Sequence, residues 1–426
     1  MPDAIRTSIE VTNLTVPDFP RERSPVLRDV DKFQRFGDDN LFPQALAQLN
    51  RQAGTHRSIL KYKTIYITGR GFIVDEANTP LLEFIKRVNQ KNENLRKIFR
   101  RLVSDYNGFG NCFLEIVTNR SRDFLSFFHQ HMPRGRVSQD GTEILFHPDW
   151  ARYSQSRALI NRVAIYPNFS EDDDGFLHSV VHIKDYEAEF TFYGLPAWLA
   201  NMDAAAIGYK TNKWNISRID NQFSGSTLIE MFGNPDDKEL QEGKKALKSE
   251  YTNQNKEGQN SKLILVVKQP GGEPTKITPL IQNSEGEWIK LHDQSTQDMI
   301  IAHNWFRSLS GLSEPGKLGN QQQIRTEYQI AENTTIPDVQ DVILDEIKMV
   351  LENETNIETE DLAVKNKPPV NITDLLNLDK VVRKGEARKM LGLEVDPDDP
   401  QMDELIDTSN GTINISTGSN RPGVSE

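Results

Sequence analysis

The sequence predicts an α+β protein in which helical and β-rich stretches follow one another instead of alternating. Apolar residues recur at helical spacing in the first hundred residues, and short β-branched and aromatic runs fill residues 111–192. A long helical stripe then begins at Leu195. Each pattern occupies its own part of the chain, which favours separate helical and β units.

The first part of the chain predicts an irregular arm followed by helices. Residues 1–36 carry scattered prolines and alternating charges without a regular apolar period. Helical spacing covers residues 41–72, with a break at Gly54, and a second helical stretch covers residues 79–104.

Residues 111–192 predict an antiparallel β unit. Short runs of β-branched and aromatic residues are separated there by turn residues such as Asp140-Gly141. The expected strands are Phe113–Val117, Phe124–Phe128, Ile144–Phe146, Val163–Tyr166, Val180–Ile183 and Phe190–Phe192.

A long helix is predicted to begin at Leu195, with Pro196 in its first turn, where proline is favoured. Its apolar stripe alternates at spacings of three and four residues, and charged residues lie off the stripe. The stripe consists of Leu195, Trp198, Met202, Ala205, Tyr209, Asn212, Ile216, Ile219 and Phe223. A stripe this narrow predicts a helix that packs along a seam against neighbours, and a long core helix within one subunit is the alternative.

The next stretch predicts a small α/β insert and a second helix. Strands are expected at Thr227–Phe232 and Lys262–Lys268, and a charged helix at Lys238–Tyr251. The segment Pro270-Gly271-Gly272 predicts a hairpin turn into a further strand. A helix follows at Ser295–Leu309, with Asp298 as the capping-box partner of Ser295.

The last hundred residues predict a loop, a bent helix and an open end. Residues 310–320 contain three glycines and one proline, which indicates a flexible loop. A helix from Gln322 to Glu352 should bend at Pro337. A short helix is expected at residues 379–393, and the polar chain after Asp396 should be disordered.

Composition and charge limit the possible functions. The single cysteine, Cys112, excludes an intrachain disulfide and fits a reducing compartment, where it should be a buried inert thiol. The net charge is −12, and residues 338–407 hold 19 acidic against 8 basic side chains. A protein that grips DNA phosphates needs a basic footprint, and none is visible. No apolar segment approaches the length of a membrane span, so synthesis and use in the cytosol are expected, away from membranes.

The chemistry-bearing motifs are sparse. Gly69-Arg70-Gly71 and Gly108-Phe109-Gly110 lack the third glycine of a dinucleotide fingerprint, and the chain contains no P-loop. His129 and His131 share one face of an expected strand, but no third metal ligand accompanies them. We therefore predict no catalytic residue, no metal site and no cofactor.

Several segments, in their order along the chain, resemble the portal proteins of tailed bacteriophages with siphovirus-like heads. The resemblance covers nearly the whole chain, although each motif alone is weak. The segments are Gly37-Asp38-Asp39-Asn40-Leu41-Phe42-Pro43, Thr55-His56-Arg57-Ser58-Ile59, Gly69-Arg70-Gly71-Phe72, Gly108-Phe109-Gly110-Asn111-Cys112-Phe113-Leu114-Glu115, Tyr193-Gly194-Leu195-Pro196-Ala197-Trp198 and Lys384-Gly385-Glu386-Ala387-Arg388-Lys389-Met390-Leu391-Gly392-Leu393.

The resemblance implies a portal fold with a β-rich wing, a helical stem, a small α/β clip, a tunnel loop and a helical crown. Its segments would be an N-terminal arm (1–36), the wing (37–193), a stem helix (194–223), the clip (224–290), a second stem helix (291–309), the tunnel loop (310–322), a kinked wing and crown helix (323–353), the crown (354–395) and a disordered tail (396–426).

The same resemblance assigns roles to particular residues. DNA would pass the tunnel-loop residues Leu312, Ser313, Lys317, Leu318 and Arg325. Subunits would pack through the stem residues Leu195, Trp198, Met202, Tyr209, Ile216, Ile219 and Trp305. The packaging motor and the tail adaptor would dock on the clip residues Lys238, Lys244, Lys245, Lys248, Gly271 and Gly272.

The implied function is a non-enzymatic ring of twelve copies at one vertex of the virion capsid, assembled in the host cytoplasm. Double-stranded DNA would pass through it without sequence-specific binding, and weak basic rings at Lys317 and Arg325 would touch its phosphates. The implied partners are the terminase large subunit, the head–tail adaptor, the major capsid protein and the scaffold. The alternatives are a nucleic-acid-processing enzyme with carboxylate-bound metal ions, motivated by the acidic C-terminal half, or another oligomeric head-assembly protein.

Overall fold

The computed structural model describes residues 32–220, 226–232, 263–268, 276–280, 285–312, 321–369 and 385. The chain divides into two compact units, residues 1–367 and 368–426, and the helices and strands named here belong to the first unit. The α-helices are α1 (Phe42–Gln52), α2 (Gly54–Thr68), α3 (Thr79–Lys86), α4 (Leu95–Phe109), α5 (Met202–Asp220), α7 (Glu285–Ala302), α8 (Gln321–Glu332) and α9 (Thr335–Glu354). Short 3-10 turns are η1 (Met132–Arg134), η2 (Trp150–Gln155), η3 (Arg157–Leu159), η4 (Ala197–Asn201) and η5 (Ser308–Ser310).

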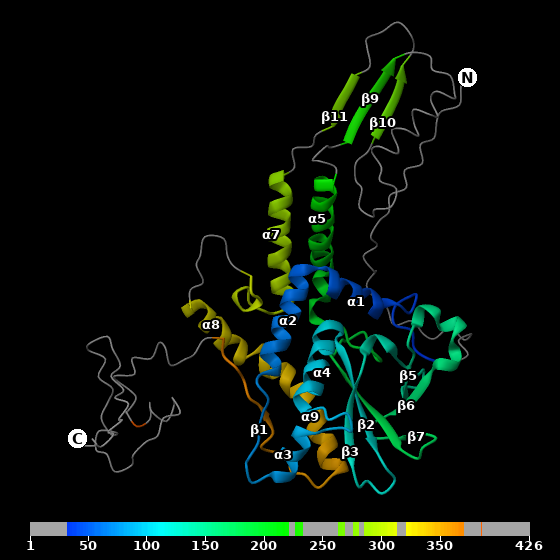
Figure 1. Cartoon of the computed structure of the whole chain (residues 1–426), viewed down its shortest axis with the longest axis vertical. Coiled ribbons are helices and arrows are strands. Elements are labelled where there is room, and N and C mark those ends of the chain that lie inside the picture. Colours follow the sequence, from blue (N-terminus) through cyan, green and yellow to red (C-terminus); the bar gives the residue numbers. More distant parts are fainter. Residues whose placement is uncertain are drawn as a thin grey trace, which may run out of the picture. The chain divides into compact units, whose positions relative to one another are not determined.

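The strands form sheets of different sizes. They are β1 (Phe72–Ile73), β2 (Asn111–Thr118), β3 (Leu125–Gln130), β4 (Gly135–Val137), β5 (Glu143–Phe146), β6 (Asn161–Ile165), β7 (Ser170–Glu171), β8 (Leu177–Lys184), β9 (Ser226–Phe232), β10 (Leu263–Lys268), β11 (Lys276–Leu280) and β12 (Ala363–Val364). The large sheet has the order β3-β2-β8-β6-β5-β4, with β7 paired to β8 (Figure 1).

The large sheet is mixed, which corrects the prediction of an antiparallel unit. Most neighbours are antiparallel, but β6 and β8 run parallel, with Ala164 opposite Ser179. The predicted strand Phe190–Phe192 is a loop, so apolar character alone misplaced it. The other predicted runs correspond to β2, β3, β5, β6 and β8, each with slightly different ends.

Helix α4 supplies the apolar face that packs against the sheet. It contacts β2 and β3 and also α2 and α9, so a layer of helices lies against the β2–β3 part of the sheet (Figure 1). The fully buried side chains on this helix include Leu95, Ile98, Phe99, Leu102 and Val103. Truncating one such leucine to alanine typically costs about 2–5 kcal/mol.

The predicted helix over residues 79–104 is two helices. Helix α3 ends at Lys86, and α4 begins only after Asn94, whose side chain accepts a hydrogen bond from the N–H of Lys97. The Asn89 side chain holds the turn between them by bonding the N–H groups of Lys91 and Glu93. Local side-chain capping therefore overrides the continuous apolar spacing.

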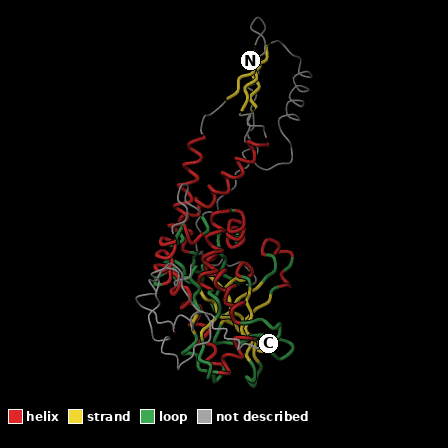
Figure 2. Tube along the Cα trace, turned by 60° about the vertical axis from the view of Figure 1, so that its left-hand side comes forward, coloured by secondary structure: helices red, strands yellow, loops and turns green. Residues whose placement is uncertain are grey.

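Helices α5 and α7 run antiparallel and side by side (Figures 1 and 2). The chain reaches α5 through η4, so the helix predicted from Leu195 begins as a 3-10 turn. Helix α7 starts at Glu285, ten residues before the predicted start, and Ser295 lies inside it with its hydroxyl donating to the carbonyl of His292. The predicted capping box at Ser295 is therefore wrong.

The segments between α5 and α7 form a separate three-stranded sheet of order β10-β9-β11. Strands β9 and β10 are parallel, whereas β11 pairs antiparallel with β9. Strands β10 and β11 are not neighbours, so the predicted hairpin at Pro270 is wrong. Parallel strands need a crossover connection of about a dozen residues or more, and 30 residues separate β9 from β10 in the sequence.

The helix predicted over residues 322–352 is broken upstream of its proline. Helix α8 ends at Glu332, and α9 begins at Thr335, which places Pro337 in its first turn. Proline is tolerated there because the first N–H groups of a helix have no intrahelical partner.

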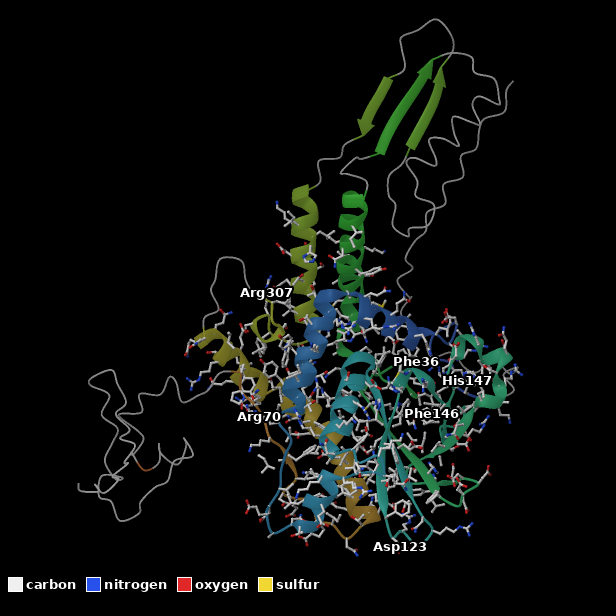
Figure 3. The ribbon with its side chains drawn as sticks, in the orientation of Figure 1. Phe36, Arg70, Asp123, Phe146, His147 and Arg307 are labelled. Atoms are coloured by element: carbon white, nitrogen blue, oxygen red, sulfur yellow. The ribbon has the colours of Figure 1, made fainter. Side chains whose placement is uncertain are left out.

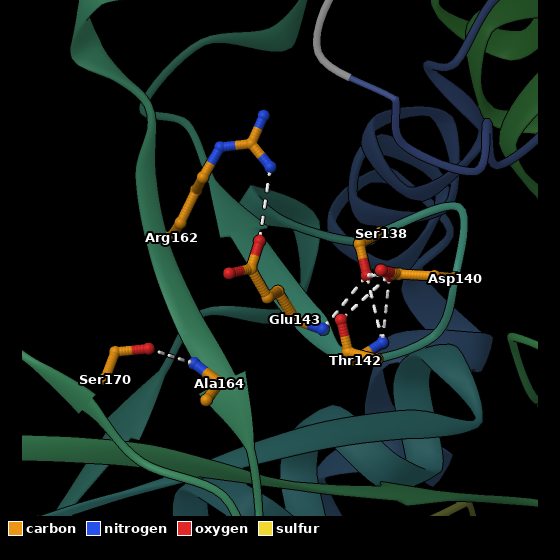
Figure 4. A network of polar contacts seen from close by, with 7 residues as sticks. All are labelled: Ser138, Asp140, Thr142, Glu143, Arg162, Ala164 and Ser170. Atoms are coloured by element: carbon orange, nitrogen blue, oxygen red, sulfur yellow. Dashed lines mark hydrogen bonds and ion pairs between the residues drawn. The ribbon is translucent and has the colours of Figure 1, made fainter.

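Residues 32–36, predicted as part of an irregular arm, pack onto the sheet. Phe33 forms an isolated β-bridge with Ser138, and Phe36 is almost fully buried. Ser138, the partner of Phe33, begins the turn between β4 and β5. In this turn Ser138, Asp140 and Thr142 hydrogen-bond to one another (Figure 4). These hydrogen bonds lower the pKa of Asp140.

Several predicted segments lie outside the described residues: residues 1–31 of the arm, the charged helix at 238–251 with the clip residues Lys238, Lys244, Lys245, Lys248, Gly271 and Gly272, nearly all of the helix at 379–393, and the tail after Asp396. Among the described helices, none is both long enough and apolar enough to cross a bilayer.

Candidate functional site

Two glycine motifs, widely separated in sequence, meet where the sheet leads into α5. Gly110 ends α4 in the left-handed conformation, and a Cβ atom on it would lie 2.2 Å from the carbonyl carbon of Leu195. The Asn111 side chain donates to the carbonyl of Gly194 at 2.7 Å and accepts from its N–H at 2.8 Å. Only a residue without a side chain allows backbones to approach this closely. The two motifs therefore form one joint.

Tyr193 ties the same joint to the N-terminal segment. Its hydroxyl donates to the carbonyl of Gln34 at 2.6 Å and accepts from the N–H of Val137. Its ring stacks on Phe36 with centroids 4.2 Å apart. Figure 3 labels Phe36 in this part of the molecule.

A buried histidine pair lies beside Trp198 at the base of α5. His56 Nδ1 and His303 Nε2 are 2.9 Å apart, and the Trp198 ring packs against both imidazoles. Burial lowers the pKa of His56 to about 3 and that of His303 well below its usual value, so both are neutral at pH 7. The Asn50 amide donates to the carbonyl of Gly108, and its Oδ1 accepts from His56 Nε2. We therefore assign the remaining bond as His303 Nε2–H donating to His56 Nδ1.

A cavity of about 340 Å³ lies next to this pair, lined by Lys63, Asp185, Asp338 and Asn107 among others. The Lys63 ammonium donates to the carbonyl of His303 at 3.1 Å. Burial lowers the pKa of Lys63 to about 8, although Asp185 and Asp338 oppose the shift. Burial also raises the pKa of Asp185. The base of the α5–α7 pair is thus polar and partly charged.

The predicted subunit contacts on α5 divide into two groups. Leu195, Trp198, Met202 and Trp305 are buried inside the chain, with exposed fractions of 6%, 1%, 6% and 5%. Almost no surface of these side chains is left for a sister molecule, so the prediction that they pack between subunits is wrong. Tyr209 is half-buried, and the side chain of Ile219 lies outside the described set.

The remaining part of the pair exposes large apolar side chains. Ile216 on α5 is 55% exposed, and Ile289 on α7 is 66% exposed. Near the base, by contrast, Ala204 and Ala205 on α5 face Thr296 and Met299 on α7 across a small gap. Small residues let the two helices approach closely there. The two helices thus pack closely near the base and leave Ile216 and Ile289 exposed farther along the pair, and Ile301 at the base end of α7 is also 60% exposed.

The predicted tunnel loop is described only at its edges. Leu312 is half-buried, and Arg325 lies partly buried on α8, whereas Ser313, Lys317 and Leu318 lie outside the described residues. Figure 3 labels Arg307, which lies between α7 and this loop; its Nε atom is buried without a hydrogen-bond partner among the described residues.

The residues flagged for chemistry have structural roles. The Cys112 thiol is fully buried, which raises its pKa well above the usual value. His129 bonds the Asp105 carboxylate at 2.8 Å. Within the described ranges, no three His, Cys, Asp or Glu side chains gather as a metal site.

Sequence reasoning missed His303 and Lys63. His56 lies within a segment noted for its family resemblance, but no local pattern indicated that His303, 247 positions later, would meet it. Lys63 lies among apolar helix positions, where a lysine is usually solvent-exposed.

No protein-family model and no curated protein matches the chain. Among solved structures, it is similar to a chain in the neck of a native gene transfer agent (GTA) particle computed with C12 symmetry, with 15% identity over 83% of this chain and 95% of that chain, at a TM-score of 0.49. It is also similar to an HK97 family phage portal protein from Corynebacterium diphtheriae, with 8% identity over 78% and 96% of the two chains, at a TM-score of 0.45. Because the identities and TM-scores are this low, a function for the chain has to rest on its own residues.

Proposed function

We propose that the chain is one subunit of a ring of twelve copies, the portal of a tailed-phage capsid, through which double-stranded DNA enters and leaves. The observation that carries the proposal is the antiparallel α5–α7 pair, whose helices pack against each other and leave Ile216 and Ile289 exposed. Burying these two side chains against another protein surface would be favourable, because it removes apolar area from water. A second copy of the chain is the occupant that closes a ring.

The segments take the roles implied by the resemblance. Residues 37–193 form the wing, residues 194–223 and 291–309 form the stem, and residues 224–290 form the clip. The part of the loop between Leu312 and α8 faces the DNA, and the crown follows the α8–α9 helices. The proposal assigns no catalytic chemistry to the chain.

The proposed partners follow from these segments. The terminase large subunit, and later the head–tail adaptor, dock on the clip. The major capsid protein and the scaffold surround the wing and crown during assembly in the host cytoplasm. The acidic balance of residues 338–407 supports a surface along which DNA slides, because each neutralised phosphate would add to the affinity.

The experiment measures assembly directly. The purified chain is imaged by negative stain and weighed by mass photometry, and we expect rings with a central hole at about twelve times 48.6 kDa. The double variant Ile216→Asp with Ile289→Asp should shift this mass toward single subunits, because charged side chains oppose burial at the seam.

The matched control is Ile73→Asp on β1. Ile73 is 54% exposed, so the substitution makes the same chemical change at similar exposure outside the α5–α7 pair. It should leave the rings intact. A single-subunit mass for the unmodified chain under all assembly conditions would refute the ring, and unchanged rings in the double variant would exclude this helix pair as the seam.

A further inference from the structure

Helix α2 contacts the short connector that joins α7 to residues 313–320, called here the Gly/Pro loop. The connector comprises residues 303–311, and much of it is buried: His303, Leu309 and Ser310 are each no more than 1% exposed. Helix α2 also packs against α4, which lies on the large sheet. It therefore links the sheet-bearing body to the start of the loop.

The upstream end of the connector is held by His56, Lys63 and Tyr66 of α2. His303 Nε2 lies 2.9 Å from His56 Nδ1, and its carbonyl accepts from the Lys63 ammonium at 3.1 Å. The Trp305 ring packs against Tyr66, with centroids 5.9 Å apart. His56 and Lys63 are seven residues apart, two helical turns, so they lie on the same side of α2.

The downstream end is held by Ser58 and Tyr62. The Ser58 hydroxyl donates to the carbonyl of Ser310 at 2.9 Å. Gly311 has a φ of +70°, and a Cβ atom there would lie 2.8 Å from the Tyr62 ring. Ser58 and Tyr62 are four residues apart and are therefore neighbours on the helix surface. Ser58 and Tyr62 therefore contact the backbone where the connector ends.

We propose that the part of α2 around Ser58 and Tyr62 is a positioning surface that fixes the point from which the Gly/Pro loop leaves the body, with these two side chains as its positioning residues. Side chains of α2 contact the connector at both of its ends, His303 and Gly311. The connector could turn back on itself without these contacts, so they have a further effect on where it lies. The loop therefore begins from a point fixed to α2 and, through α4, to the sheet. Any consequence for DNA passage rests on the proposed function, but the positioning itself does not.

The test uses the chain's single cysteine. Cys112 is fully buried and its pKa is raised, so a thiol reagent should leave it unlabelled. In the variant Leu312→Cys, a nitroxide label therefore attaches only at position 312 and reports on the mobility of the residue that follows the connector. Adding Ser58→Ala should increase the mobile fraction of the label about fivefold, the factor expected on losing one hydrogen bond. Adding Tyr62→Ala instead should also increase it.

The control is Ser179→Ala in the same labelled chain. Ser179 is fully buried on β8, and its hydroxyl also donates to a backbone carbonyl, that of Ala164. This variant should leave the label spectrum unchanged. Equal spectra for Ser58→Ala and Ser179→Ala would overturn the proposal, and Ser58→Ala keeps the test decisive if Tyr62→Ala fails to fold.

A second measurement tests the Gly311–Tyr62 fit. Gly311→Ala should increase label mobility because the added methyl group meets the Tyr62 ring, and pairing it with Tyr62→Ala should give less than the sum of the two single effects. Additive effects would count against the fit. Ring mass is recorded for each variant: a mobility response without rings would retain the positioning surface and remove the proposed function.

Discussion

At the scale of single residues, the chain buries the guanidinium of Arg136 among neutral oxygens. Arg136 is fully buried, and its guanidinium donates to neutral oxygens of Asn40, Gln44, Gly135 and Pro133. Burial lowers its pKa to about 10, so it stays charged at neutral pH. A planar group with five donors can satisfy these acceptors together. Arg136 thus holds the segment around Asn40 against the sheet.

Replacing the Arg136 guanidinium should destabilise the fold even when the positive charge is kept. Arg136→Lys is expected to lower the free energy of unfolding by about 2–4 kcal/mol, because an ammonium cannot reach both Asn40 and the carbonyl of Gly135. Urea unfolding followed by circular dichroism measures the change. The exposed neighbour Arg134, changed to lysine in the same way, should stay within about 0.5 kcal/mol; similar values for both variants would contradict this role of Arg136.

Lys63 predicts a specific pH dependence. Its pKa falls from 10.5 to about 8 on folding, so between those values the unfolded chain binds more protons than the folded chain. Stability from this residue therefore increases as pH rises from about 8 to 10.5, by about 3 kcal/mol. Lys63→Met should remove that rise in urea unfolding measured across the window, whereas Lys61→Met, at an exposed position, should keep it. An unchanged slope in Lys63→Met would contradict burial of the charge.

At the scale of elements, periodicity predicted most helices and strands but not their breaks. Strands β2 and β9 lie close to the predicted runs, because β-branched and aromatic runs between turn residues are strong local signals. The break between α3 and α4 depends on hydrogen bonds from the Asn89 and Asn94 side chains to the backbone. These bonds do not alter the spacing of the apolar residues, so the spacing gives no sign of the break. The order of β9, β10 and β11 depends on pairing between distant segments, which local sequence does not encode.

The joint between Gly110 and Gly194 gives the prediction at this scale. In Gly194→Ala the new Cβ would lie 2.4 Å from the carbonyl oxygens of Asp185 and Gly110, so the backbone must shift. We expect a loss of about 1–3 kcal/mol in the free energy of unfolding. Gly208→Ala is the matched control inside α5, where a Cβ meets nothing within 4 Å, and it should stabilise the helix by about 1 kcal/mol. Equal effects of the two substitutions would show that the joint is not tightly packed.

At the scale of the whole molecule, α5 shows why the candidate site was only partly predictable. Its stripe keeps one spacing from Leu195 onward, and that spacing fits both a core helix and a seam between subunits. The structure contains both environments: Trp198 and Met202 are core residues, whereas Ile216 is exposed. The core residues differ from Ile216 because α2, α7 and η4 pack around the first turns of α5. No local sequence pattern indicates which elements will be neighbours there.

The charge of the assembled ring gives the last prediction. Each copy carries a net charge of −12, so a ring should hold free duplex DNA only weakly at physiological salt, with a dissociation constant no tighter than on the order of 10 μM. Removing both proposed basic rings, Lys317→Ala with Arg325→Ala, should make log K against log salt shallower by about 0.9 for each phosphate that is no longer neutralised. Fluorescence anisotropy of a labelled duplex across a salt series measures that slope.

The control pair for the DNA measurement is Lys86→Ala with Arg87→Ala at the exposed end of α3. It makes the same charge change and should leave the slope as it is, because those side chains are proposed to lie on the wing, away from the DNA. Equal slopes for the two pairs would mean that the loop side chains do not meet the phosphates. Tight binding at high salt would contradict a channel through which DNA slides, since a strand held that firmly could not be moved past twelve copies of the same surface.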